Sequence, residues 1–83
     1  MITPPQSRAA RGLLEWSQED LAVRSNLGMS TIRDFEKGRR VPTINSLTAI
    51  QRAIEEAGVE FIAENGGGPG VRLAKRTRKA RGR

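Results

Sequence analysis

The side chains of this chain that could bind or transform another molecule are mainly guanidinium, ammonium and carboxylate groups. The 83 residues include fifteen Lys and Arg, nine Asp and Glu, and neither His nor Cys. Without imidazole or thiol groups, the chain lacks the commonest general base and the thiolate ligands of zinc sites. We therefore expect no metal site, no cofactor and no enzymatic activity, and the groups that remain favour binding of a polyanion.

The excess positive charge is concentrated at one end of the sequence. Residues 75–83 hold six Lys or Arg and no acid, whereas residues 1–74 hold nine basic and nine acidic residues. Clustered basic residues typically mark a surface that contacts nucleic acid. A solvated tail that only improves solubility is the alternative, and general nucleic-acid or RNA binding through this tail stays open as a function.

Length and hydropathy limit the class of protein further. Eighty-three residues suffice for one small domain with a modest core. No apolar run approaches the length of a membrane span, and the N-terminal MITPPQSRAARG lacks the features of a signal peptide. We therefore expect no membrane interaction and a cytoplasmic, nucleoid-associated location.

The N-terminal part of the sequence predicts two short helices. Two prolines suit an opening helical turn, and the apolar residues after them place the first helix at residues 5–15. Ser17, with Asp20 three residues later, forms a capping-box pattern that begins a second helix over 18–24. Trp16, just before this cap, is interpreted as a hydrophobic staple rather than as a stacking platform for bases.

Two further helices and a hairpin complete the expected elements. The stretch GMSTIRDFEKGRR predicts a third helix from residue 28 or 29 to 37, ended by the glycine that follows. Thr43 caps a fourth helix that ends at Gly58. The apolar segments 59–63 and 70–74 flank a glycine-rich stretch and predict a small β-hairpin, with an unpaired extended arm as the alternative.

The second and third helices form a helix-turn-helix pattern, which is two short helices joined by a tight turn. Leu21 and Ala22 face inward from the second helix, and Asn26 tolerates the left-handed conformation of the turn. Ile32 and Phe35 anchor the third helix on its apolar side, which leaves a polar outer side.

At these residues the sequence resembles the lambda-repressor-like, Cro-type helix-turn-helix regulators, also called the xenobiotic-response-element (XRE) family. The resemblance rests on SQEDLA at 17–22, STIRDFEKGRR at 30–40 and VPTINSL at 41–47, and it covers residues 7–57. It implies a mainly α, compact domain of four to five helices that binds double-stranded DNA, usually as a homodimer on a palindromic or repeated site. We place this domain at residues 1–58.

The resemblance also implies roles for individual residues. The base-reading positions correspond to Met29, Ser30, Arg33 and Asp34. The expected phosphate-binding residues are Gln18, Lys37, Arg39 and Arg40. An arginine of the first helix and a glutamate of the third match a structural ion pair, Arg11 and Glu36. Two residues depart from the family pattern, because Gly28 replaces the usual Ser or Thr cap and Met29 replaces a polar reader.

Each expected base-reading residue also has an alternative role that involves no base. Arg33 either forms a bidentate pair with guanine or contacts a phosphate. Asp34 could accept from cytosine N4, but we favour its pairing with Lys37 three residues on. Ser30 can reach a phosphate or a base edge, and Met29 can touch a thymine methyl group or pack beneath the second helix.

The C-terminal part lies outside the resemblance. Residues 59–74 form the hairpin or arm, and five of them are too apolar for a free tail: Val59, Phe61, Ile62, Val71 and Leu73. They either pack on the helical core or pair with the same segment of a second chain, and we favour dimerisation. Residues 75–83 form a basic tail that could follow phosphates or lie in a minor groove.

The sequence therefore favours a sequence-specific, dimeric transcriptional repressor that occupies an operator. The chain has no evident ligand pocket and no room for an effector domain, so we expect control by concentration or by a regulatory protein partner. The main alternative is a protein-binding module with the same fold, either antitoxin-like or controlled by an antiactivator.

Overall fold

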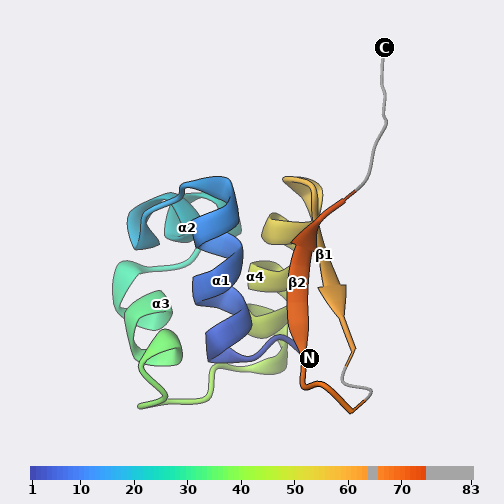
Figure 1. The fold of residues 1–83 in the computed structure, drawn as a ribbon. Coiled ribbons are helices and arrows are strands. Elements are labelled where there is room, and N and C mark those ends of the chain that lie inside the picture. Colours follow the sequence, from blue (N-terminus) through green and yellow to red (C-terminus); the bar gives the residue numbers. More distant parts are fainter. Residues whose placement is uncertain (64–65, 75–83) are drawn as a thin grey trace.

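The computed structural model describes residues 1–63 and 66–74, which form four helices and a two-stranded hairpin (Figure 1). The elements are α1 (Pro4–Leu14), α2 (Gln18–Ser25), α3 (Met29–Glu36), α4 (Ile44–Glu56), β1 (Val59–Ile62) and β2 (Gly70–Leu73). This confirms the mainly α fold and the hairpin, in place of an unpaired arm. Within the described residues, none of the helices is long and apolar enough to cross a bilayer. The basic tail 75–83 lies outside the described residues.

Local capping groups set the limits of the helices. Ser17 and Asp20 form a reciprocal capping box: the Asp20 N–H donates to Ser17 Oγ at 3.0 Å, and the Ser17 N–H donates to Asp20 Oδ2 at 2.9 Å. Asn26 ends α2 in the left-handed conformation, with φ of 60°. Thr43 Oγ1 accepts from the Ser46 N–H at 3.1 Å and so caps α4.

The first helix begins one residue earlier than the sequence predicted, because Thr3 forms a second capping box. Thr3 Oγ1 accepts from the Gln6 N–H at 3.3 Å, and Gln6 Oε1 accepts from the Thr3 N–H at 2.9 Å. Pro4 has no N–H to satisfy and so suits the first turn. Gln6 Nε2 also donates to the carbonyl of Gly70 at 3.0 Å, which ties the start of α1 to β2.

One hydrophobic core joins the helices to the hairpin. Its fully buried members on the helices are Ala10, Leu21, Ile32, Ile50 and Ile54. Val59 is only 2% exposed, and Phe61 and Val71 pack against the same core. Figure 1 shows α1 between the α2–α3 pair on one side and the hairpin on the other. Helices α1 and α4 each contact both the α2–α3 pair and the hairpin, so both helices can hold the two parts in place.

The hairpin offers less surface to a second chain than its apolar sequence indicates. The strands are antiparallel, with the pairs Val59–Leu73, Glu60–Arg72, Phe61–Val71 and Ile62–Gly70. On the outer face, Glu60 Oε1 accepts from Arg72 Nε at 2.8 Å. Three of the five residues expected to make a dimer thus pack into the core of their own chain, while Ile62 is partly exposed and Leu73 is 54% exposed. Dimerisation through the hairpin stays a prediction.

Candidate nucleic-acid interface

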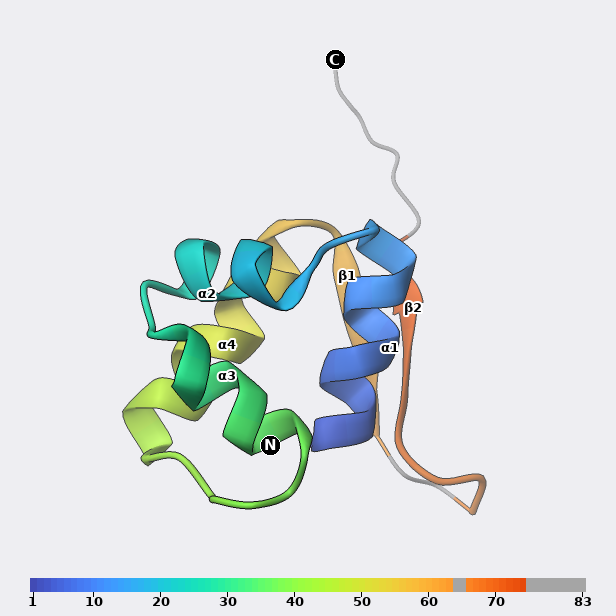
Figure 2. The same cartoon turned by 90° about the vertical axis from the view of Figure 1, so that its left-hand side faces the viewer.

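The third helix has a buried side and an exposed side. Ile32 and Phe35 are 0% and 4% exposed and belong to the core. On the outer side Met29 is 38% exposed, and Ser30 and Arg33 are also exposed. Figure 2 looks onto the face that carries α2 and α3, with the loop after α3 along its lower rim. An exposed helix with polar outer residues has the dimensions that a DNA major groove admits.

The start of α3 has no side-chain cap. Gly28 occupies the N-cap position and makes no side-chain hydrogen bond to the helix. A Ser or Thr at this position would supply such a bond, and a Gly cap costs only a few tenths of a kcal/mol by comparison. The departure from the family pattern is therefore small in energy, and Met29 follows it on the surface.

Asp34 pairs with Arg39 and not with Lys37, so the predicted pairing is wrong. Asp34 Oδ1 lies 4.0 Å from Arg39 Nη1. The chain turns back at Gly38, whose φ is 74°, and the Arg39 N–H donates to the carbonyl of Asp34 at 2.9 Å. A spacing of three residues would favour Lys37 only if the helix continued through it, whereas α3 ends at Glu36. A long, exposed ion pair is worth only about 0–1 kcal/mol, so a phosphate can compete for Arg39.

A basic edge follows α3. Lys37, Arg39 and Arg40 are all exposed, and they fall within four consecutive residues at the end of the helix. Exposed guanidinium and ammonium groups beside the exposed side of a helix are suited to contact phosphates, which in protein–DNA complexes fix register and orientation.

Behind α3, Glu36 is the centre of a buried network. The predicted ion pair is present: Arg11 Nη2 lies 2.8 Å from Glu36 Oε1, and Arg11 Nε donates to Oε2 at 3.0 Å. Ser7 Oγ donates to Oε2 at 2.5 Å, and Gln18 Nε2 donates to Oε1 at 3.2 Å. The side chain of Glu36 is 1% exposed and that of Arg11 is 20% exposed. One carboxylate thus joins α1, α2 and α3.

Gln18, an expected phosphate-binding residue, is a member of this network. It is the first residue of α2 and is partly exposed. A primary amide nitrogen carries two hydrogens, and the bond to Glu36 uses one of them. The second hydrogen is left for a phosphate at the same end of α2, so the phosphate contact of Gln18 stays a prediction.

Sequence reasoning missed two residues that hold α3. Ser7 donates to the Glu36 carboxylate, and Arg8 Nη1 donates to the main-chain carbonyl of Glu36. Ser7 lies on the same helix face as Ala10 and Leu14, so a polar residue in an apolar stripe was the available signal. Arg8 carries no comparable signal, because an arginine on the exposed side of a helix is ordinary.

The network changes the acidity of Glu36. Burial by itself would raise the pKa of this carboxyl group. Hydrogen bonds from Arg11, Ser7 and Gln18, together with the positive charge of Arg11, outweigh burial, so the pKa lies below its ordinary value of 4.5. The folded protein thus holds Glu36 ionised more firmly than the unfolded chain does.

We expect the stability that Glu36 contributes to be lost in acid. Because the pKa is lower in the folded state, the unfolded chain binds the proton first on acidification. The contribution is therefore present above the ordinary pKa of 4.5 and disappears as the pH falls through the lower folded value. Thermal melting of wild type and Glu36→Gln across this range tests it, since the variant should lack this part of the pH dependence. Parallel profiles for the two proteins would contradict the assignment.

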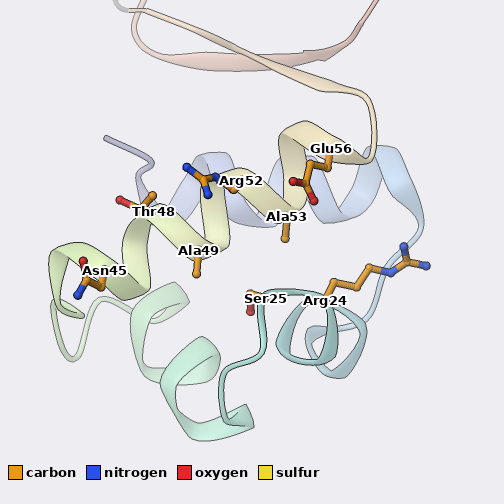
Figure 3. A pocket seen from close by; sticks show the side chains of 8 residues that line it. All are labelled: Arg24, Ser25, Asn45, Thr48, Ala49, Arg52, Ala53 and Glu56. Carbon is orange, nitrogen blue, oxygen red and sulfur yellow. The ribbon is translucent and has the colours of Figure 1, made fainter.

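A groove between α2 and α4 is shown in Figure 3. Its lining residues are Arg24, Ser25, Asn45, Thr48, Ala49, Arg52, Ala53 and Glu56. Its volume is about 280 Å³, below the range of roughly 300–1,000 Å³ that is usual for ligand pockets. In the described part of the chain, no three Asp, Glu, His or Cys side chains are placed to hold a metal ion.

Arg52 lies on the side of α4 that points away from α3 in Figure 3, which makes it a control residue for the experiments below.

Comparison with known proteins agrees with this geometry. The chain is 33% identical over 64 residues to multiprotein-bridging factor 1 of Schizosaccharomyces pombe, and the alignment covers 77% of this chain and 39% of the length of that protein. Residues 8–60 match the helix-turn-helix family, a range that includes α2, α3 and α4. The chain belongs to this family, as a lambda-repressor-like (Cro-type, XRE) helix-turn-helix domain of the DNA-binding regulators.

Proposed function

We propose that this protein is a sequence-specific, double-stranded DNA-binding transcriptional regulator that acts as a dimeric repressor on a palindromic or repeated operator. The observation that carries the proposal is the arrangement of α3, whose inner side is buried and whose outer side exposes Met29, Ser30 and Arg33. In this arrangement α3 enters the major groove while α2 crosses the DNA backbone.

The exposed side chains of α3 recognise bases through both polar and apolar contacts. The guanidinium fork of Arg33 fits N7 and O6 of one guanine. The thioether chain of Met29 offers an apolar surface to a thymine methyl group, and the Ser30 hydroxyl accepts or donates at a base edge. Asp34 contributes less to reading, because its carboxylate already lies beside Arg39.

Phosphate contacts surround this reading surface. Gln18 stands at the start of α2, and Lys37, Arg39 and Arg40 follow the end of α3. Phosphate contacts beside a reading helix keep that helix in register with the bases. We therefore assign these four residues to the DNA backbone.

Selection of bound duplexes from a random pool tests this function. At moderate salt and with scrambled competitor, we expect enrichment of one short sequence that occurs twice. The two copies should lie about 10 base pairs apart, centre to centre, or a multiple of that spacing. A pool that shows no enrichment after repeated rounds contradicts sequence-specific binding.

The proposed dimer predicts a sensitivity at Leu73, which is 54% exposed on the hairpin. Leu73→Glu places a charge on that surface without opening the core, so the mass measured by light scattering should fall from dimer to monomer. Val23→Glu is the matched control, because Val23 is 73% exposed on α2. A dimer that survives Leu73→Glu but not Val23→Glu places the interface on α2 instead.

The basic tail is assigned to additional phosphate contacts. Removal of residues 75–83 should lower the slope of log K against log salt by about 0.9 for each phosphate that the tail neutralises. Fluorescence anisotropy with a selected duplex at several salt concentrations measures this slope. An identical slope with and without the tail contradicts the assignment.

Protein binding is the second candidate function. The relative found in Schizosaccharomyces pombe is named for bridging between proteins. An antitoxin-like module, or one controlled by an antiactivator, would use the same helical fold. Failure of the duplex selection, together with stoichiometric co-purification of a protein partner, would favour this second function.

A further inference from the structure

Helix α1 reaches α3 through a second arginine, Arg8, which lies one helical turn before Arg11. Arg8 Nη1 donates to the main-chain carbonyl oxygen of Glu36, the last residue of α3. The final carbonyl groups of a helix have no partner within the helix, and a positive charge beside them is favourable. Arg8 therefore supplies both a hydrogen-bond donor and a complementary charge to the end of α3.

The other carbonyl groups near this end are satisfied by the turn that follows. The N–H groups of Lys37, Gly38 and Arg39 donate to the carbonyls of Arg33, Phe35 and Asp34, at 3.1, 3.0 and 2.9 Å. The carbonyl of Glu36 is the one that receives a side chain from another helix. Arg8 thus completes the closing turn from outside, at the point where the chain leaves α3 for the basic edge.

Contacts from other helices matter for α3 because this helix would have little stability in isolation. It has eight residues, and its N-cap, Gly28, gives no side-chain hydrogen bond. Isolated helices of this length are marginal in water. Core packing of Ile32 and Phe35 holds one side of α3. The bond from Arg8 and the network at Glu36 then act at the C-terminal end.

We propose that Arg8 is a positioning residue for α3, which fixes the last turn of the reading helix and the departure of residues 37–40 without itself contacting DNA. The consequence for DNA rests on the proposed function, whereas the contact with α3 exists in the free protein. Arg11 binds the Glu36 carboxylate, and Arg8 binds the backbone of the same residue, so the two arginines fix different parts of α3.

Amide hydrogen exchange of the free protein tests the contact directly. In Arg8→Ala, exchange at Phe35, Glu36 and Arg39 should accelerate by about tenfold relative to exchange at Ile50 in α4, because only local opening is affected. Arg8→Lys keeps one donor and the charge, so it should restore part of the protection. Arg52→Ala, which removes an exposed arginine from α4, should change none of these rates.

The free-protein experiment has two outcomes that overturn the proposal. Unchanged exchange at the end of α3 would show that the hydrogen bond from Arg8 does not stabilise the last turn of this helix. Equal acceleration at Ile50 and α3 would show a general loss of stability rather than positioning. Both results are independent of DNA, so they stand even if the wild-type protein binds no duplex and the proposed function fails.

DNA binding by Arg8→Ala then separates positioning from direct contact. We expect the affinity for a selected duplex to fall by about three- to tenfold, since the side chains that read bases need a firmly held support. The salt slope should equal that of wild type. A slope lowered by about 0.9 would mean that Arg8 neutralises a phosphate, and an unchanged affinity would mean that it positions nothing; either result overturns the proposal.

Discussion

Replacement of Glu36 by alanine should lower the free energy of unfolding by about 3–5 kcal/mol, the usual cost of breaking a buried ion pair from one side. The substitution leaves the Arg11 guanidinium, which is 20% exposed, without its carboxylate. It also removes the acceptor of Ser7 and of Gln18. Urea denaturation, with linear extrapolation of the unfolding free energy to water, measures the loss.

The chain offers a matched control for this experiment. Glu60 and Arg72 form an ion pair with the same 2.8 Å separation, but their side chains are 45% and 67% exposed. Glu60→Ala should therefore cost only about 0–1 kcal/mol, since water screens the pair and can replace it. Equal losses for Glu36→Ala and Glu60→Ala would contradict the structural role of burial at Glu36. A Glu36→Ala protein that melts like wild type but no longer binds DNA would transfer Glu36 to the binding surface.

The helix limits could be predicted because the signals that set them are local. The Ser17 and Asp20 capping box needs only four residues of chain, and Asn26 adopts the left-handed conformation that its sequence position indicated. Thr3 and Gln6 carry the same type of signal, but the two prolines between them also suit a helix that starts one residue later. Local hydrogen bonding therefore explains both the starts that were predicted correctly and the missed start of α1, whereas the C-terminal ends of α1, α2 and α3 each differ from the predicted ones by one residue.

The contacts between distant parts of the chain could not be read in the same way. Whether the apolar hairpin residues pack on their own helices or on a second chain depends on the volume left beside α1 and α4, which no local pattern records. The pairing of Asp34 depends on the turn at Gly38, which brings Arg39 back to the helix. Periodicity identified the sides of α3, but it did not give the path of the chain beyond its end.

The candidate site also has residues that a local pattern predicted and residues that only long-range packing brings together. Helical spacing predicted a polar outer side for α3, and the resemblance to the family assigned Met29, Ser30 and Arg33 to base reading; all three are exposed. The support behind them is long-range. Ser7 and Arg8 lie 29 and 28 residues from Glu36 in sequence, and their contacts exist only because α1 packs beside α3.

Arg33→Ala should abolish most of the sequence preference while leaving the fold intact. Arg33 is exposed on the outer side of α3, and its loss opens no cavity in the core. A bidentate arginine–guanine pair is worth about 1–3 kcal/mol of discrimination, so the selected duplex should lose roughly five- to 150-fold in affinity. The scrambled duplex should lose little. Anisotropy titrations of both duplexes at one salt concentration give the ratio.

Two further variants decide what Arg33 does on DNA. Arg33→Lys keeps the charge but not the planar fork, so it should retain binding to scrambled duplex and still lose the preference for the selected one. Arg52→Ala removes an equal charge from the far side of α4 and should change neither affinity by more than the general effect of one surface charge. If Arg33→Ala weakens both duplexes equally and Arg33→Lys restores both, Arg33 contacts a phosphate. The preference for sequence would then have to come from Met29, from Ser30 and from the shape of the DNA itself.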